Sequence, residues 1–294
     1  MIETPEIVVE SVCGALGEKV LSNSDVASSQ VVAATGFAER RVSGAGLFEL
    51  SMKAVAGLGD LGDVGGVVAA TFSNEVRFPS LAVRIASALK LPAGTAAFDL
   101  QLACSAYPYA VYLAGKLAAD LGRRVLVVDG DVQSRFAKSS ETAAVMSDAA
   151  AATVVSSDPS SSGRSRFSFY SNYSEALTCR REIEMDGFKV YSFVAGEVRR
   201  LIAQLAENRT GEIDAFVPHQ ANMYMVRQLA RAVKLEDRLV ATGEEFGNTG
   251  SSSVALALTK CRPGARALIA GFGAGFSAAA GIVRLADDFR AAVV

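Results

Sequence analysis

The 294-residue sequence has no tryptophan, a single histidine, His219, and no excess of charge of either sign. Its 29 lysine and arginine residues are balanced by 31 aspartate and glutamate residues. These charges are interleaved, so the chain offers no basic face for nucleic acid and no polybasic stretch for an anionic membrane. It also has no run of about 18 strongly apolar residues and no signal-peptide pattern at its start. We therefore expect a cytoplasmic protein that binds neither nucleic acid nor membrane.

The sequence also lacks paired cysteines. Cys13, Cys104, Cys179 and Cys261 lie far apart, and no CxxC spacing occurs. Zinc sites and disulfide frameworks both depend on cysteines at characteristic spacings. We therefore expect no metal site and no disulfide framework, and we interpret each cysteine as a single thiol.

What the chain does contain is apolar material for a large core. Half of its residues are hydrophobic and a fifth are charged, which excludes a disordered chain. Short apolar runs alternate with helical stretches, and this alternation predicts an α/β protein with parallel strands and helical crossovers. The first half is predicted to contain strands at 7–12, 64–72, 95–102, 125–128 and 151–155, and helices at 47–58, 81–89 and 105–121.

A stretch rich in serine, SSDPSSSGRS at 156–165, divides the chain nearly in half. Its composition is typical of a solvated connection. The pattern then resumes, which predicts two similar α/β halves, residues 1–158 and 159–294. The second half is predicted to contain strands at 166–170, 213–217, 267–271 and 278–285, and helices at 188–207, 222–233 and 252–260.

Three residues stand where chemistry is possible. Cys104 follows a predicted strand and precedes a predicted helix, whose positive end would favour a thiolate. His219 follows another strand, at the end where parallel sheets bind ligands. Asn248 precedes a helix of small residues. Taken alone, Cys104 is better interpreted as an inert buried thiol and Asn248 as a capping or turn residue, whereas His219 is evenly balanced between the two interpretations.

Taken together, six segments resemble the β-ketoacyl-acyl-carrier-protein synthase III family of condensing enzymes. They are TGFAERRV (35–42), FPSLAVRIASAL (78–89), FDLQLACSAYPYA (98–110), VPHQAN (217–222), FGNTGSSSVALAL (246–258) and GFGAGF (271–276). The resemblance implies the thiolase fold, in which two similar α/β halves form a five-layered αβαβα structure. The halves carry the nucleophile in 1–158 and the histidine and asparagine in 159–294.

The resemblance also implies a reaction. Cys104 would take an acyl group from a thioester, with the N–H groups of Cys104 and Ala274 as oxyanion hole. His219 and Asn248 would stabilise the enolate formed as a malonyl thioester loses carbon dioxide. Attack on the acyl group would give a 3-oxoacyl thioester, in fatty acid or related secondary-metabolite synthesis such as that of polyketides. No cofactor is implied, because the substrates are thioesters of coenzyme A or acyl carrier protein.

The resemblance extends to binding and assembly. It implies a homodimer, or a heterodimer with a homologue, in which Phe78 lines the partner's acyl pocket. It further assigns substrate binding to Ala221, Asn222, Gly247 and Phe272. Docking of the carrier protein is assigned to Arg227, Arg231 and Lys234.

The sequence departs from the family's pattern near the expected substrate. Ala34 and Ala38 replace basic residues, Tyr224 replaces an arginine, and SDAAAA (147–152) replaces a glycine-rich segment that retains its aspartate as Asp148. These departures keep two alternatives open. One is an acyltransferase that works without decarboxylation, and the other is a partner subunit of a heterodimeric condensing enzyme.

Overall fold

The computed structural model describes residues 1–294, apart from the side chain of Glu141. Nine strands form one mixed sheet in the order β11-β12-β13-β8-β1-β7-β6-β4-β5. These strands are β1 (Ile2–Leu16), β4 (Gly66–Ala70), β5 (Ala96–Leu100), β6 (Val125–Asp131), β7 (Ala149–Asp158), β8 (Arg164–Ser174), β11 (Ala215–Pro218), β12 (Arg266–Gly273) and β13 (Gly275–Val293). Two separate two-stranded sheets pair β2 (Lys19–Ser22) with β3 (Glu39–Val42), and β9 (Leu177–Cys179) with β10 (Ile183–Met185).

The same pairing pattern occurs twice in this sheet. β4 runs parallel to β6, and β7 lies antiparallel between β6 and β1. In the same way β11 runs parallel to β12, and β13 lies antiparallel between β12 and β8. The prediction of parallel strands is therefore wrong for β7, β8 and β13. Only β13 follows its paired neighbour, β12, through a short turn, which permits only antiparallel pairing. Residues 132–148 connect β6 to β7, and β8 pairs with β1 and β13 rather than with β7, which precedes it.

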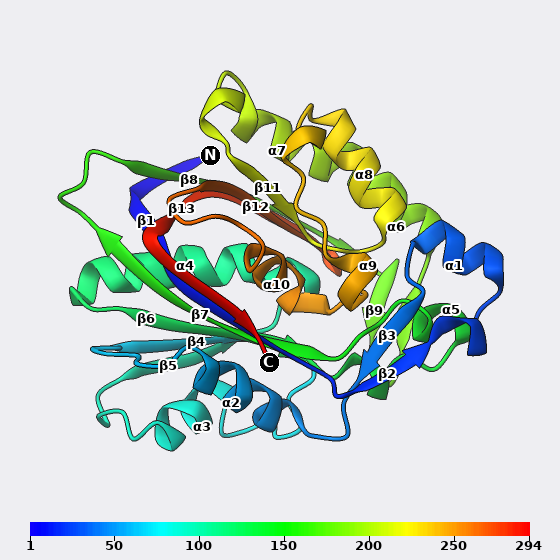
Figure 1. Ribbon diagram of the computed structural model, residues 1–294, viewed down its shortest axis with the longest axis horizontal. Coiled ribbons are helices and arrows are strands. Elements are labelled where there is room, and N and C mark those ends of the chain that lie inside the picture. The colour runs from blue at the N-terminus through cyan, green and yellow to red at the C-terminus, as the bar shows by residue number, and fades with distance from the viewer.

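The helices complete a five-layered structure (Figure 1). They are α1 (Ser29–Thr35), α2 (Leu47–Gly57), α3 (Leu81–Ala88), α4 (Ala106–Leu121), α5 (Ser140–Ala143), α6 (Gly187–Phe193), α7 (Arg199–Ala206), α8 (Met223–Ala232), α9 (Gly243–Phe246) and α10 (Ser253–Leu258). The middle layer is formed by α4 and α10, which pack against strands of both halves of the sheet. The outer layers are α2 and α3 on one side and α6, α7 and α8 on the other. The predicted αβαβα architecture is confirmed.

The middle helices are buried because their sequences are almost entirely apolar or small. Every residue of α10 is buried, and Tyr107, Ala110, Val111 and Ala114 of α4 are completely inaccessible to solvent. A helix without a polar face is stable only where it is covered on all sides. At its other end α4 stops at Gly122, as predicted, with the left-handed backbone (φ 61°) that glycine adopts readily.

The serine-rich connection is shorter than predicted. Only residues 159–163 link β7 to β8, because Ser156, Ser157 and Asp158 pair with Val8, Ile7 and Glu6 of β1. The division of the chain into residues 1–158 and 159–294 stays a prediction, and its boundary falls in this turn.

Most predicted elements are present, with longer strands than expected. The helix predicted at 188–207 consists of α6, a π-helical segment over Val194–Val198, and α7. The two small sheets and α1 were not predicted, because the four strands are too short to show a period and β2 is fully exposed. Within the part of the chain that is described, no helix is long and apolar enough to cross a membrane.

The substituted segment SDAAAA (147–152) is accommodated by a glycine across the strand pair. Ala150 of β7 pairs with Gly130 of β6. A methyl group on Gly130 would lie 2.7 Å from both Cα and Cβ of Ala150. The sheet therefore accepts the methyl group of Ala150 because its partner has none.

We expect Gly130→Ala to destabilise the protein by about 1–3 kcal/mol, the usual cost of overpacking a tight core. The free energy of unfolding from urea titrations measures the effect. Gly94→Ala is the control, because a methyl group there meets nothing within 4 Å. Equal stability of the two variants would contradict the close packing of β6 on β7.

Candidate active site

Cys104 lies where a strand gives way to a buried helix, as predicted. It is the central residue of the 3-10 turn Ala103–Ser105, which leads directly into α4. Ala103 has a left-handed backbone (φ 45°), which costs a residue other than glycine about 1–3 kcal/mol. Strain of this kind at a strand-to-helix turn holds a side chain in a fixed direction. Here the turn presents the thiol of Cys104 to a cavity.

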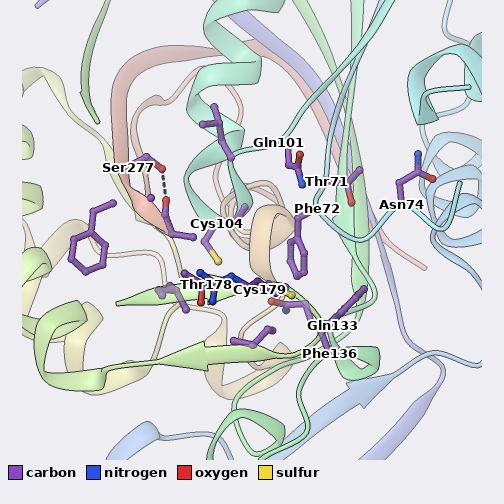
Figure 2. Close-up of a pocket in the computed structure, with 18 of the residues that line it drawn as sticks. Thr71, Phe72, Asn74, Gln101, Cys104, Gln133, Phe136, Thr178, Cys179 and Ser277 are labelled. Atoms are coloured by element: carbon purple, nitrogen blue, oxygen red, sulfur yellow. Dashed lines mark hydrogen bonds between the residues drawn. The ribbon is translucent and has the colours of Figure 1, made fainter. Parts of the chain in front are cut away.

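The cavity beside Cys104 has a volume of about 1160 Å³ (Figure 2). Polar side chains in its wall include Gln101, Gln133 and Thr178. A second thiol, that of Cys179, also lines it. Apolar side chains form much of the remaining wall, namely Phe72, Phe136, Met146, Leu177, Ile183 and Phe276. The mixture suits a ligand with an apolar chain and a polar end.

The wall opposite Cys104 comes from elements that the sequence did not reveal. Leu177, Thr178 and Cys179 belong to β9 and Ile183 to β10. This hairpin is fixed by the rest of the structure, since the Ile183 N–H donates to the carbonyl of Phe136 over 2.9 Å. The unpredicted hairpin therefore determines part of the cavity's shape.

Burial governs the acidity of Cys104. Loss of solvation raises the pKa of the thiol to about 12, and the nearby Asp131 carboxylate adds to the rise. We predicted that the helix N-terminus would favour the thiolate, but burial outweighs the helix dipole. The resting residue is therefore a thiol at neutral pH.

The glycine-rich turn at 271–276 lies against Cys104. A methyl group on Gly273 would approach the Cys104 Cβ to 3.0 Å, so the strand end can pack here only without a side chain. Ala274 lines the cavity together with Cys104. Its carbonyl accepts a hydrogen bond from Ser277 Oγ (2.7 Å), and this fixes the orientation of the segment. The assignment of the Cys104 and Ala274 N–H groups to an oxyanion hole stays a prediction.

His219 lies at the end of β11, as predicted, and is 2% exposed. Its N–H donates to the carbonyl of Ala270 over 2.7 Å, and its ring meets Phe272 edge-on, with centroids 5.3 Å apart. On the other side, Nδ1 lies 2.6 Å from the Ser253 hydroxyl. Burial lowers the pKa of His219 to about 3. The imidazole is therefore neutral at neutral pH.

Asn248 is held by both its backbone and its side chain. Its carbonyl accepts hydrogen bonds from the Ser147 N–H and from Gln133 Nε2, each over 2.8 Å. Its side-chain Oδ1 accepts from the Gly250 N–H (3.0 Å), and Nδ2 donates to the carbonyl of Ala221 (3.4 Å). The interpretation of Asn248 as a turn residue is therefore correct for Oδ1, which holds the backbone of the turn. One amide hydrogen of Nδ2 still has no acceptor within the described residues.

The structure brings the three predicted residues into one region. The turn Ala103–Ser105 packs against the turn Gly250–Ser252, which follows Asn248. Phe272 contacts His219, and the next residue, Gly273, lies against Cys104. His219 and Asn248 are not among the residues that line the large cavity. The Cys104 thiol therefore faces the cavity, while His219 and Asn248 are buried beside the turn Ala103–Ser105.

The other predicted binding residues differ in what they contact. Phe272 is buried against His219. Asn222 caps α8, since its Oδ1 accepts from the Met225 N–H over 2.8 Å. Gly247 has a left-handed backbone (φ 72°). Phe78 is 86% exposed, and the residues just before it in the chain line the cavity. Their assignment to substrate binding stays a prediction.

The predicted docking residues lie on and after α8. Arg227 and Arg231 line a groove of about 260 Å³ together with Ala34 and Tyr224, between α1 and α8. Arg227 also pairs with Glu244. Lys234 follows the helix and does not line the groove. The two arginines give the groove a basic side even though Ala34 and Tyr224 replace basic residues.

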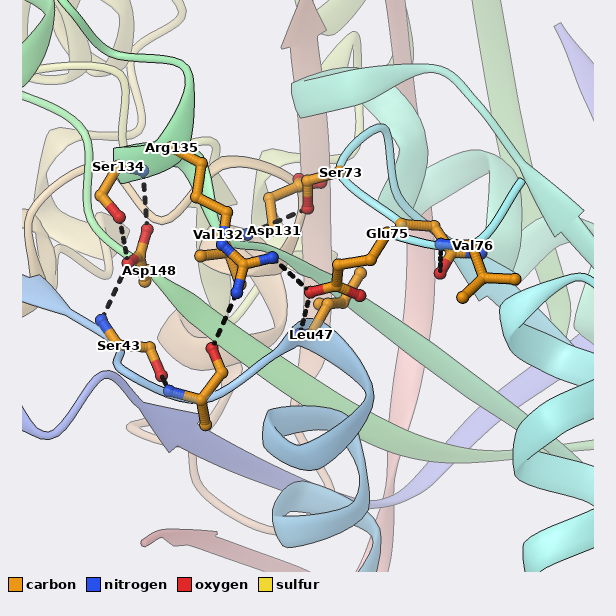
Figure 3. A network of polar contacts seen from close by, with 12 residues as sticks. Ser43, Leu47, Ser73, Glu75, Val76, Asp131, Val132, Ser134, Arg135 and Asp148 are labelled. Carbon is orange, nitrogen blue, oxygen red and sulfur yellow. Dashed lines mark hydrogen bonds and ion pairs between the residues drawn. The ribbon is translucent and has the colours of Figure 1, made fainter. Parts of the chain in front are cut away.

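Asp131 and Asp148 hold the site together, and of these two the sequence drew attention only to Asp148, as the retained aspartate of a substituted segment. The Asp131 carboxylate at the end of β6 accepts from Thr71 Oγ1 (2.9 Å) and from Ser251 Oγ (2.7 Å), and so joins both halves of the chain. The retained Asp148 accepts from the Ser43 N–H (2.9 Å) and from Ser134 (Figure 3). For Asp131, its position at the end of a buried strand was the one feature of the sequence that could have indicated a role in the site. Among the described residues, no group of histidine, cysteine and acidic side chains is arranged to hold a metal ion.

The layers and the position of Cys104 define the class: the chain is a condensing enzyme of the thiolase fold, an acyltransferase. Two family models match it. "3-Oxoacyl-(acyl-carrier-protein) synthase III" matches residues 98–173, which include Cys104. The model of the C-terminal part of the same family matches residues 204–285, which include His219 and Asn248.

Individual proteins of the same family are also similar to this chain. The β-ketoacyl-(acyl-carrier-protein) synthase III of Lactobacillus delbrueckii subsp. bulgaricus is 30% identical over 247 residues, which cover 74% of this chain and 77% of that one. The protein of the same name from Thioalkalivibrio sulfidiphilus is 28% identical, over 92% of this chain and 97% of its own. The crystal structure of the priming β-ketosynthase from the R1128 polyketide biosynthetic pathway is 26% identical, with a TM-score of 0.85 over 97% of this chain and 98% of that one. The chain belongs to the β-ketoacyl-acyl-carrier-protein synthase III family.

The neutral burial of His219 predicts a loss of stability in acid. Its pKa is lowered from 6.5 to about 3 on folding, so between these values the unfolded chain binds a proton that the folded chain does not. The stability gained from the neutral ring is therefore present above pH 6.5 and falls as the pH drops through this window. Relative to His219→Gln, we expect the free energy of unfolding of the wild type to fall by about 1.6 kcal/mol between pH 6.5 and pH 5. Urea unfolding at each pH measures this, and parallel curves for the two proteins would contradict it.

Proposed function

We propose that this chain joins an acyl group on Cys104 to a malonyl unit with loss of carbon dioxide, and releases a 3-oxoacyl thioester. The observation that carries the proposal is the buried arrangement of one thiol with two neutral hydrogen-bond donors, His219 and Asn248. The relatives named as β-ketoacyl-(acyl-carrier-protein) synthase III and as a priming β-ketosynthase support it. The product would enter fatty acid or polyketide synthesis. The reaction consumes two thioesters and needs no cofactor.

The first step loads Cys104. The thiol loses its proton as the sulfur attacks the thioester carbonyl, because its pKa of about 12 leaves little free thiolate. The N–H groups of Cys104 and Ala274 hold the oxyanion, and the carrier leaves as a thiol. The apolar part of the cavity takes the acyl chain. The adjacent polar groups, Gln101 and Thr178 among them, favour a chain that is not purely hydrocarbon along its whole length.

The second step forms the carbon nucleophile. The unused amide hydrogen of Asn248 and the Nε2–H of His219 are donated to the thioester oxygen of the malonyl unit. The bond between the carboxylate and the α-carbon breaks, and carbon dioxide leaves. The electrons of that bond form an enolate whose negative charge lies on the thioester oxygen. The enolate carbon attacks the acyl carbonyl, and the Cys104 sulfur departs and regains a proton. Neutral donors suit this step, since they stabilise the enolate without protonating it.

We expect Cys104→Ala to abolish formation of the 3-oxoacyl product, because no acyl-enzyme can form. Intact-mass spectrometry after mixing with acyl thioesters should show an acyl increment on the wild type and none on Cys104→Ala. Cys261→Ala is the matched control, since that thiol is also partly buried but does not line the cavity.

Two outcomes would overturn the proposal in different ways. Acylation of Cys104 without decarboxylation of any malonyl donor, on coenzyme A or carrier protein, would indicate a simple acyltransferase. A wild type that gains no acyl mass from any donor would indicate the partner subunit of a heterodimer.

We further propose that the thioester substrates, carried by acyl carrier protein or coenzyme A, dock on the groove of Arg227 and Arg231. We also propose that the enzyme is a homodimer formed through β5. This strand is at the end of the sheet, with β4 as its one neighbour. Open strand edges are usually paired or covered. Large apolar side chains are exposed nearby, with Phe98 on β5 37% and Val83 on α3 43% exposed. Phe78 would then reach the partner's cavity.

We expect Phe98→Lys to convert the dimer into monomers, because a charge at the strand edge opposes pairing of two copies. Sedimentation velocity measures the mass directly. Phe188→Lys is the control, since Phe188 is 80% exposed and its helix, α6, belongs to the outer layer on the other side from α3. A wild type that sediments as a monomer would contradict the homodimer and leave the heterodimer with a homologue.

A further inference from the structure

The tautomer of His219 decides whether it can serve the reaction. A neutral imidazole carries its single proton on either Nδ1 or Nε2, and the partner of one nitrogen sets the state of the other. Nδ1 is turned towards the protein, 2.6 Å from Ser253 Oγ. Only a proton on Nε2 leaves a donor for a ligand.

The surroundings of Ser253 determine the direction of this hydrogen bond. Ser253 is 1% exposed, so no bulk water competes. Its oxygen already accepts a hydrogen bond from the Gln220 N–H, over 3.4 Å. Among the described residues, the ring nitrogen is the one acceptor recorded for its hydroxyl proton. The hydroxyl therefore donates to Nδ1, which then cannot carry a proton.

We propose that Ser253 is a positioning residue that fixes His219 as the Nε2–H tautomer. This role of Ser253 rests on the proposed condensing function, because the Nε2–H tautomer supplies the hydrogen-bond donor for the enolate. Ser253 is also the first residue of α10, so the middle-layer helix controls the state of the histidine directly. Phe272 packs edge-on against the same ring, with the centroids 5.3 Å apart.

The single histidine of the chain makes the test unambiguous. Protein labelled with ¹⁵N-histidine gives NMR signals from one imidazole, and these report which nitrogen is protonated. At pH 7 we expect the wild type to show the Nε2–H form. Ser253→Ala should shift the population towards Nδ1–H. Ser253→Thr, which retains a hydroxyl, should restore Nε2–H.

Ser252→Ala is the matched control. Ser252 is the preceding residue and is equally buried, but its hydroxyl donates to the carbonyl of Thr249 rather than to the histidine. It should leave the tautomer unchanged. Kinetically, Ser253→Ala should slow malonyl decarboxylation by up to about a thousandfold, because complete loss of one such donor costs about a hundredfold to a thousandfold. The rate of acylation of Cys104 should not change.

A wild-type spectrum of the Nδ1–H form would overturn the proposal, as would a Ser253→Ala spectrum identical to that of the wild type. If Ser253→Ala does not fold, the wild-type and Ser253→Thr spectra still decide, because both must show Nε2–H. The NMR result is independent of activity. An inactive wild type with the expected tautomer would therefore overturn the proposed function and support the role of Ser253.

Discussion

The structure depends on burying two helices that are mostly apolar or small. Every residue of α10 is buried, and α4 is apolar or small apart from residues such as Lys116 and Asp120, so both helices lie between the two halves of the sheet. The turns that begin the two helices pack against each other, and Cys104 and Asn248 lie on or beside those turns. The position of the site is thus a consequence of how the core is covered.

The same burial keeps the side chains of the site uncharged. It raises the pKa of the Cys104 thiol and lowers that of the His219 imidazole, so both are neutral at neutral pH. The charge of the reaction is then carried by the substrate rather than by the protein. Fixed dipoles can hold an enolate without fully neutralising it, and the enolate carbon remains nucleophilic. Hydrogen bonds from Gln133, Gly250 and Ser253 orient these dipoles before any substrate binds.

The sequence was informative wherever the relevant signal was local. Strand and helix periods predicted the core elements, and motifs in order predicted the positions of Cys104, His219 and Asn248. The antiparallel course of β7, β8 and β13 was missed, because apolar runs carry no direction. The hairpin of β9 and β10 was missed because three-residue strands show no period. Ser253, Gln133 and Asp131 were missed for another reason: their partners lie 34 to 120 residues away in the chain. No window of sequence contains both members of such a pair.

The proposed reaction depends on the stabilisation of an enolate by two neutral hydrogen-bond donors, His219 and Asn248. The substitution Asn248→Asp tests this dependence. The substitution keeps the shape of the side chain but replaces an N–H donor with an oxygen, and with a negative charge when ionised. Release of labelled carbon dioxide from a carboxyl-labelled malonyl thioester is the measurement, made on protein already acylated at Cys104. We expect unchanged acylation and a decrease in carbon dioxide release of about a hundredfold or more, the cost of removing one such donor. Decarboxylation at the wild-type rate would contradict it.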